Sequence, residues 1–168
     1  MPLNFAYGSN METDSMAARC PGARLLGRGA LAGYRFALMP DGYATVVRDP
    51  AATAAGVLWE CSFADQAALD RYECVADGAY KKRTLPVLRE GASPTRALVY
   101  IGVPGPALGR APADYMAKII AAARGHGFAE DYIAFLRCTA GESVEPPPKK
   151  FRAIKNPAVL RDSNERKA

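Results

Sequence analysis

One carboxylate and one small polar turn are the parts of this sequence best suited to chemistry. Glu73 follows Leu69 by four positions in "ADQAALDRYECV", so a helix there would place both residues on one face. A carboxylate held partly out of water acquires a raised pKa, which suits a general base working near neutral pH. Most glutamates on helices are solvated, however, and the helical period alone favours a surface position for Glu73.

The turn is the tripeptide Gly8–Ser9–Asn10, which follows the strand-like residues Phe5 and Tyr7. Gly8 lets a ligand approach the backbone closely, so N–H groups there can converge on a carboxylate or an oxyanion. Ser9 and Asn10 add side-chain donors. The same composition is ordinary for a turn that ends a strand, so the tripeptide alone is weak evidence of a site.

Cysteine and histidine offer little alternative chemistry. The chain has one histidine, His126, and its four cysteines are Cys20, Cys61, Cys74 and Cys138. The cysteines form no CxxC pair, so a zinc site has poor support. Each has apolar neighbours, which predicts buried, reduced thiols. His126 is expected in a loop that ends a helix. We therefore predict no metal and no cofactor.

Six short runs of apolar or alternating residues predict the strands that must position Glu73 and the polar turn. They are "LNFAYG" at 3–8, "GYRFALM" at 33–39, "YATVVRD" at 43–49, "AAGVLWEC" at 54–61, "KRTLPVL" at 82–88 and "TRALVYIGV" at 95–103. Glycine or proline turns separate most of them. The strands outnumber the helices and do not alternate regularly with them. This favours an α+β domain whose strands form a small mixed barrel or a strongly bent sheet, rather than a doubly wound parallel sheet.

Three helices are expected. The first spans about 64–75, where Ser62 can cap and Asp65 lies three residues on, as in a capping box. The second spans about 113–124, with Pro112 near its first turn. The third spans about 129–138. No strand is followed by GxGxxG or GxxxxGK[ST], so phosphate-binding loops of those types are not predicted.

The basic charge is confined to the end of the chain. Residues 149–168 hold seven basic and two acidic residues, so the whole formal charge of +5 falls there and residues 1–148 are balanced. Three prolines in "EPPPKK" at 145–150 oppose regular structure. We expect one domain at 1–142, then a proline-rich spacer and a flexible basic tail at 143–168. Such a tail can make weak, salt-sensitive contacts with an anionic partner, but it is not a dedicated nucleic-acid-binding domain.

The composition is that of a globular protein without a membrane span. The chain has 168 residues, of which 49% are hydrophobic and 23% charged, enough for one core. No apolar run approaches the roughly 20 residues of a membrane helix, and the N-terminus lacks the layout of a secretory signal. The cytoplasm is the expected compartment. The oligomeric state is left open.

Taken together, these stretches resemble the γ-glutamylcyclotransferase-like (AIG2-like) family. The resemblance rests on YGSN near the N-terminus combined with LDxxE and a following tyrosine. The stretches concerned are "FAYGSNM" at 5–11, "RCPGARLLGRGALAGYRF" at 19–36, "GVLWE" at 56–60, "LDRYECVADGAYKKRTLPV" at 69–87 and "ADYMAKIIAAARGHGFAEDYIAFL" at 113–136. The similarity covers nearly all of 3–138 and leaves the tail unmatched.

The resemblance implies a compact mixed α/β barrel with a cavity between barrel and helices. In the family, the YGSN loop binds the glutamyl end of the substrate and the Glu of LDxxE is the catalytic acid/base, which falls on Glu73. Two further tyrosines would line the pocket. The substrate-binding residues implied in this way are Tyr7, Gly8, Ser9, Asn10, Tyr80 and Tyr115. One departure is Cys74, where the family commonly has glycine after the catalytic glutamate.

The reaction that this implies needs no protein nucleophile. A γ-glutamyl amide carries a free α-amine whose attack on the γ-carbonyl closes 5-oxoproline and expels the attached amine. One carboxylate can take the proton and return it. Which γ-glutamyl substrate reacts, and whether the loop holds the α-carboxylate or the oxyanion, stays open. The alternative is a non-catalytic binding module for γ-glutamyl-like ligands.

Overall fold

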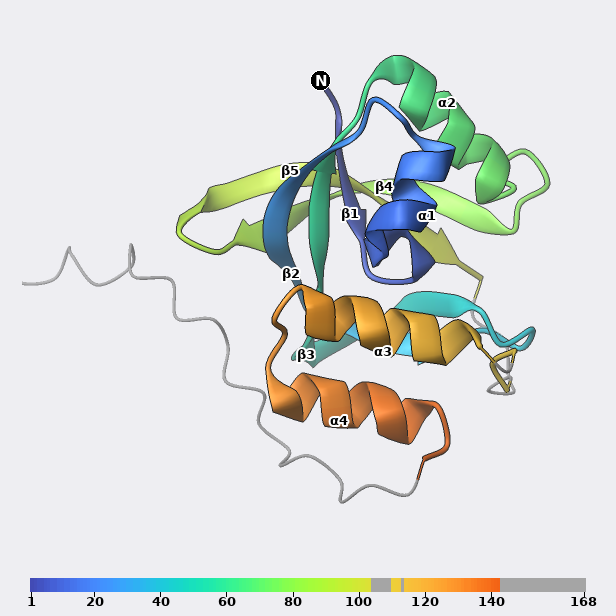
Figure 1. Ribbon diagram of the computed structural model, residues 1–168, viewed down its shortest axis with the longest axis vertical. Helices are drawn as coiled ribbons and strands as arrows, with labels where there is room; N and C mark the ends of the chain where they lie inside the picture. Colours follow the sequence, from blue (N-terminus) through green and yellow to red (C-terminus); the bar gives the residue numbers. More distant parts are fainter. Residues whose placement is uncertain (104–109, 113, 143–168) are drawn as a thin grey trace, which may run out of the picture.

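In the computed structural model, which describes residues 1–103, 110–112 and 114–142, five strands close into a barrel (Figure 1). The order around the barrel is β1–β3–β2–β4–β5, and β1 closes it against β5 as the one parallel pair of these strands. The strands are β1 (Leu3–Ala6), β2 (Arg24–Leu38), β3 (Ala44–Glu60), β4 (Tyr80–Arg89) and β5 (Ala92–Gly102). The α+β class and the mixed barrel are as the sequence predicts.

β3 is a single strand where the sequence predicts two, at 43–49 and 54–61. Its pairing with β2 shifts register around Gly33, whose φ is +76°. Pro50, which has no N–H to donate, lies between the paired residues of β3 at this shift. The backbone stays extended through the irregularity. Pro50 therefore lies at a bulge within one strand, and the prediction of two strands was wrong.

Helices cover two sides of the barrel (Figure 1). They are α1 (Thr13–Arg19), α2 (Phe63–Tyr72), α3 (Tyr115–Gly125) and α4 (Glu130–Thr139), with a short 3₁₀ helix η1 (Ser9–Met11) after β1. α3 and α4 lie side by side against one end of the barrel. The last three α-helices match the predicted ones to within a few residues. α1 was not predicted, because seven residues are too few for a clear apolar period.

The predicted capping box begins α2. The Ser62 hydroxyl accepts the Asp65 N–H at 3.1 Å, and the Asp65 carboxylate accepts the Ser62 N–H at 2.9 Å. Asp65 also accepts the Gly22 N–H, at 3.3 Å. Because these bonds connect the start of α2 with the segment after α1, they fix the position of the helix that ends at Glu73.

β1 is almost wholly buried, with three of its four residues buried. Phe5 is 1% exposed and belongs to one apolar cluster that extends from the barrel into α3 and α4. Burying a side chain of this size stabilises the fold by about 1.5–3 kcal/mol. β3 approaches β1 so closely at Gly56 that an added Cβ would lie 2.3 Å from the Ala6 carbonyl oxygen. The strand that leads into the polar turn is therefore held rigidly on both sides.

The prediction of four buried thiols holds for two cysteines. Cys20 and Cys61 are buried, and burial raises their pKa values to about 11 and about 12, so both stay protonated thiols near neutral pH. Cys138 is half-buried. Cys74 is exposed, which corrects the prediction: it follows the end of α2, in a turn at the surface.

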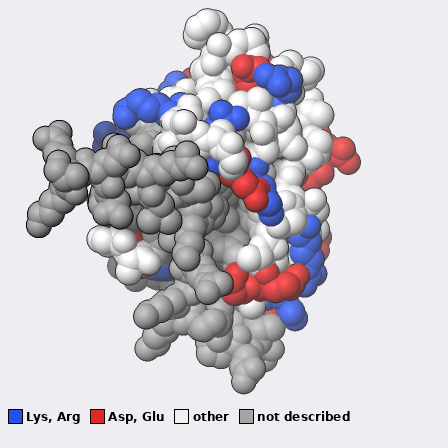
Figure 2. All heavy atoms as spheres, turned by 90° about the vertical axis from the view of Figure 1, so that its left-hand side faces the viewer, with Lys and Arg blue, Asp and Glu red and all other residues white. Residues whose placement is uncertain are grey.

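On the face shown in Figure 2, Lys and Arg side chains are interspersed with Asp and Glu where described residues are visible. Several are paired, such as Arg24 with Glu60 at 2.7 Å. No helix among residues 1–103, 110–112 and 114–142 is long and apolar enough to cross a membrane. The predicted spacer and basic tail at 143–168 lie outside the described residues.

Candidate active site

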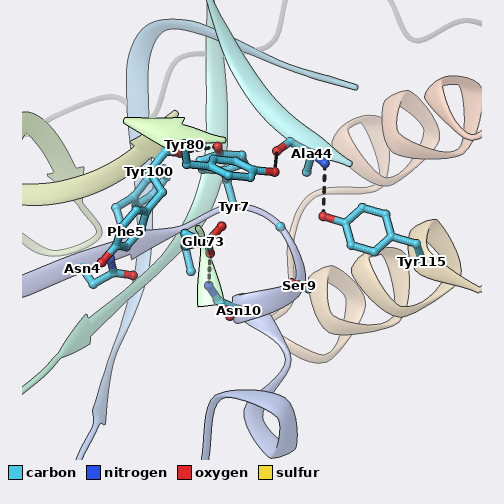
Figure 3. A pocket seen from close by; sticks show the side chains of 12 residues that line it. Asn4, Phe5, Tyr7, Ser9, Asn10, Ala44, Glu73, Tyr80, Tyr100 and Tyr115 are labelled. Carbon is cyan, nitrogen blue, oxygen red and sulfur yellow. Dashed lines mark hydrogen bonds between the residues drawn. The ribbon is translucent and has the colours of Figure 1, made fainter. Parts of the chain in front are cut away.

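All seven residues singled out from the sequence line one cavity (Figure 3). It opens where β1 runs into η1, between the end of α2, the start of β3 and the start of α3. Its lining consists of Asn4, Phe5, Ala6, Tyr7, Gly8, Ser9, Asn10, Ala44, Glu73, Tyr80, Tyr100 and Tyr115. Glu73 is the one acidic or basic side chain in this lining. Residues from distant parts of the sequence therefore meet at one point of the fold.

The polar turn forms one wall of the cavity. The Met11 N–H donates to the Gly8 carbonyl at 3.0 Å, which closes the turn. A Cβ added at Gly8 would lie 3.2 Å from the Ala44 Cβ and 3.4 Å from the Tyr115 hydroxyl, so any side chain here would narrow the cavity. On the other side, the Trp59 indole donates to the Asn10 carbonyl at 3.0 Å. The turn is thereby fixed to β3.

Glu73 faces this turn from the end of α2 (Figure 3). It is the residue that ends the helix, and the Asn10 side-chain amide donates to its Oε1 at 2.8 Å. Burial raises the pKa of Glu73 to about 7, against smaller lowering effects of the Asn10 hydrogen bond and the Arg19 charge. Glu73 is half-buried, so it is not the fully solvated residue that the helical period favours. Near neutral pH both protonation states of Glu73 are populated.

The backbone after Glu73 has a defined helix-ending geometry. The Cys74 N–H donates to the Arg71 carbonyl at 3.1 Å and the Val75 N–H to the Asp70 carbonyl at 3.0 Å. This is a Schellman motif, and it places Cys74 in the left-handed region with φ +48°. Glycine adopts that conformation without strain, whereas Cys74 carries a side chain there.

Two tyrosines hold the start of β3 at the far wall. The Tyr80 hydroxyl donates to the Ala44 carbonyl at 2.7 Å, and the Ala44 N–H donates to the Tyr115 hydroxyl at 3.1 Å. Burial raises the pKa of Tyr115 to about 12 and that of Tyr80 still further. Both phenols therefore stay protonated near neutral pH. Tyr115 accepts the Ala44 N–H and keeps its own proton to donate.

Tyr100 and Ala44 belong to the cavity but were not predicted. Tyr100 accepts the Tyr7 hydroxyl through its backbone carbonyl, and its own hydroxyl donates to Asp70 at 2.6 Å. The sequence pattern around Tyr100 predicted a strand at 95–103, but it did not show which end of the barrel each side chain would face. Asp70 is also held by Lys82 at 2.7 Å, so within LDRYE the aspartate binds neighbouring elements and the glutamate faces the cavity.

The described residues provide no arrangement suited to a metal ion. In the ranges 1–103, 110–112 and 114–142, no three His, Cys, Asp or Glu side chains gather as ligands. His126 ends α3, as expected, and its Nε2 lies 2.7 Å from the Met11 carbonyl oxygen. The chemical resources of the cavity are therefore one carboxylate, several phenols and the amide and hydroxyl groups of the turn.

Known structures share this fold. A γ-glutamyl cyclotransferase matches with a TM-score of 0.76 at 22% identity, over 86% of this chain and 88% of its own. An uncharacterised protein from Homo sapiens matches with a TM-score of 0.75 at 23% identity, over the same shares. A yeast γ-glutamyl cyclotransferase described as specific to glutathione matches with a TM-score of 0.56 at 13% identity, over 83% of this chain and 95% of its own.

Sequence comparison points to the same group. The model of the AIG2-like family matches residues 54–136, which run from β3 through Glu73 to α4. No protein among the curated ones matches the sequence. Identities of 22–23% show a shared fold and leave the activity to be argued from the site. Residues 54–136 thus resemble the AIG2-like family, and the barrel has the γ-glutamyl cyclotransferase fold.

Proposed function

We propose that this protein is a γ-glutamylcyclotransferase-type enzyme, which converts a γ-glutamyl amine or amino acid into 5-oxoproline and the free amine. The observation that carries the proposal is the position of Glu73. Its carboxylate, with a pKa of about 7, faces the Gly8–Asn10 turn inside one cavity. A group with this pKa can both accept and return a proton near neutral pH, which is what the cyclisation requires.

The proposed reaction balances with Glu73 as its single proton carrier. The carboxylate takes a proton from the substrate's α-ammonium group. The freed amine nitrogen then attacks the γ-carbonyl carbon, which forms the ring C–N bond and places negative charge on the carbonyl oxygen. Ring closure leaves the attacking nitrogen with two hydrogens and a positive charge. As the oxygen re-forms the carbonyl, the original amide C–N bond breaks and Glu73 gives its proton to the leaving nitrogen. The carboxylate then takes the second proton from the ring nitrogen, which yields neutral 5-oxoproline, and passes it to the released amine, which leaves as an ammonium ion. The carboxylate is regenerated with each turnover.

The other lining groups support this reaction by holding the substrate. The attacking amine and the γ-carbonyl belong to the same substrate molecule. The main requirement is therefore that the site hold the substrate folded, with its amine against its carbonyl. The Gly8–Asn10 turn would hold the glutamyl end, either at its α-carboxylate or at the developing oxyanion. Tyr80 and Tyr115, both protonated at neutral pH, line the opposite wall. The Tyr80 hydroxyl donates to the Ala44 carbonyl, so Tyr115 is the one of the two that keeps its proton to donate to the substrate. We place the activity in the cytoplasm, which the composition favours.

A substrate panel tests the proposal. The protein is incubated with γ-glutamyl dipeptides, glutathione and a γ-glutamyl-lysine-type amide, and 5-oxoproline is measured. Matched α-glutamyl dipeptides serve as the control. Their amide is at the α-carbonyl and their γ-carboxylate is free, so attack of the amine on the γ-carbon has no amine to expel. We expect 5-oxoproline from at least one γ-linked compound and none from its α-linked match. The relative rates identify the leaving amine.

The same panel separates the enzyme from a binding module. Saturable binding of γ-glutamyl compounds without any 5-oxoproline would overturn the enzyme proposal and favour the module. The site argues for turnover, since a purely binding pocket has no need of a carboxylate whose pKa burial has raised to about 7.

A further inference from the structure

Arg19 lies outside the cavity lining and contacts Asn10, the residue whose side chain donates a hydrogen bond to Glu73. It is the last residue of α1, and its guanidinium donates to the Asn10 Oδ1 at 2.6 Å. The Asn10 Nδ2 in turn donates to the Glu73 Oε1 at 2.8 Å. A chain of two hydrogen bonds therefore connects the positive charge on α1 with the carboxylate at the end of α2.

This chain determines which way the Asn10 amide is turned. A guanidinium has five donors and no acceptor, so only the amide oxygen of Asn10 can face Arg19. The amide NH₂ is thereby directed at Glu73. Without Arg19, the side chain could rotate by half a turn and present its oxygen to the carboxylate, which would repel the ionised form.

Arg19 is itself held by Tyr72. Its guanidinium carbon lies 3.7 Å from the centre of the Tyr72 ring, and a second nitrogen donates to the Tyr72 hydroxyl at 2.8 Å. Stacking of this kind orients the planar guanidinium as well as attracting it. Because Tyr72 directly precedes Glu73, the contact connects the arginine with the same helix end that carries the carboxylate.

We propose that Arg19 is a positioning residue for Glu73: it fixes the Asn10 amide so that the amide donates to the carboxylate. This inference rests on the proposed function only for its effect on turnover. The effect on the proton equilibrium of Glu73 follows from the contacts alone.

The other titratable groups around Glu73 do not stabilise its ionised form. The titratable side chains that interact with it from the surrounding segments are Tyr7 just after β1, Tyr80 on β4, Tyr100 on β5 and Tyr115 on α3. All are phenols whose pKa is raised, so they stay neutral at the pH where Glu73 titrates. Arg19 is thus the charged side chain that, with Asn10, opposes the effect of burial on the pKa of Glu73.

Arg19→Met and Arg19→Lys test the proposal. Methionine keeps the apolar stem and loses both donors and charge. Lysine keeps the charge and loses the planar fork. We expect kcat of Arg19→Met to fall by roughly 10- to 100-fold, since the carboxylate loses its defined position. The acidic limb of its pH profile should move to higher pH, because the ionised form of Glu73 loses its support. Arg19→Lys should give a smaller shift of the limb.

Arg24→Met is the matched control. It removes an arginine that is paired with Glu60 at the barrel surface and takes no part in the cavity. The ¹³C titration of the Glu73 carboxyl, assigned with Glu73→Gln, is followed in all variants without substrate. It should move to higher pH in Arg19→Met and stay unchanged in Arg24→Met.

The two readouts separate this inference from the proposed function. If the unaltered protein forms no 5-oxoproline, the proposed function fails, while the carboxyl titration still tests Arg19. An unchanged titration in a folded Arg19→Met or Arg19→Lys variant would overturn the inference. Loss of stability with an unmoved titration would overturn it too, because that is the signature of a merely structural arginine.

Discussion

The two ends of α2 each carry a carboxylate, and the two carboxylates have opposite properties. Asp65, in the first turn, is 4% exposed and accepts hydrogen bonds from Ser62 and Gly22. Burial raises its pKa, but these bonds outweigh burial and the pKa is lowered. Glu73, at the other end, accepts one hydrogen bond from Asn10, and burial raises its pKa to about 7.

Asp65 is buried and Glu73 half-buried, so the number of donors around each carboxylate, rather than its burial alone, decides what it can do. Asp65 is fully satisfied by fixed N–H and O–H groups, so it stays ionised and serves to hold the start of the helix. Glu73 is under-satisfied, so its charge is costly and its proton exchangeable near neutral pH. One short helix thus has a structural carboxylate at its beginning and a chemically available one at its end.

Glu73→Gln should separate the two roles with the largest effect. The amide oxygen can still accept the Asn10 hydrogen bond, so the fold is retained, but no proton can be carried. We expect 5-oxoproline formation to fall by about 10²–10⁴-fold, measured as kcat/KM on the best substrate of the panel. Full activity in this folded variant would disprove the assignment of Glu73.

Asp65→Ala should lower stability and leave activity nearly unchanged, which is the reverse of Glu73→Gln. The Ser62 and Gly22 N–H groups lose their acceptor in a buried place, which should lower the free energy of unfolding by roughly 1–3 kcal/mol. At a temperature where the variant is folded, kcat should stay within about twofold, because Asp65 does not line the cavity. Urea denaturation and kinetics on one preparation give both values. A large loss of kcat with unchanged stability would invalidate the comparison.

These two carboxylates also show how far the sequence could predict the molecule. The capping box at Asp65 is local, since its partner is three residues away, and it was predicted from spacing. The burial of Glu73 depends on Asn10, which is 63 residues away, and on Tyr80 and Tyr115 beyond it. Helical period alone favoured solvent for Glu73, and only the combined YGSN and LDxxE stretches indicated that the two would meet.

In the fold, too, the features set by local patterns could be predicted and those set by distant contacts could not. The barrel, the class and three of the α-helices follow from local patterns of apolar residues and turns. The continuity of β3 through Pro50 does not, because whether a proline ends a strand or marks a bulge is decided by the partner strand, here at Gly33. Arg19 lies on α1, a helix too short to be predicted, so its contact with Asn10 could not be anticipated either.

The pH dependence of stability should distinguish the carboxylates next. Glu73 has a pKa of about 7 when folded and 4.5 as an unperturbed group, so the folded state binds its proton more tightly. This contribution is fully present below pH 4.5 and is lost as pH rises to about 7. Between pH 5 and pH 8 the wild type should lose roughly 2 kcal/mol that Glu73→Gln does not lose.

The measurement is urea denaturation of both proteins at the two pH values, where the effects of other groups cancel in the difference. Asp65 has the opposite sign: its lowered pKa gives stability that is kept above the ordinary range of an aspartate and lost as pH falls through the folded pKa. It therefore contributes nothing to this interval. A constant stability difference between the two proteins from pH 5 to pH 8 would contradict the raised pKa of Glu73.

Cys74→Gly should have the smallest effect, and it tests whether the end of α2 is strained. Cys74 has φ +48°, a conformation that costs a residue with a side chain about 1 kcal/mol or more relative to glycine. Its side chain is exposed, so replacing it removes little packing. We expect the free energy of unfolding to rise by about 0.5–1 kcal/mol, with kcat within about twofold because the Schellman hydrogen bonds are kept. Cys74→Ala, which keeps a Cβ at the same φ, is the control and should give no gain. An equal gain with alanine would mean that the thiol, rather than the left-handed backbone, limits stability, and the strain would then lie elsewhere than beside Glu73.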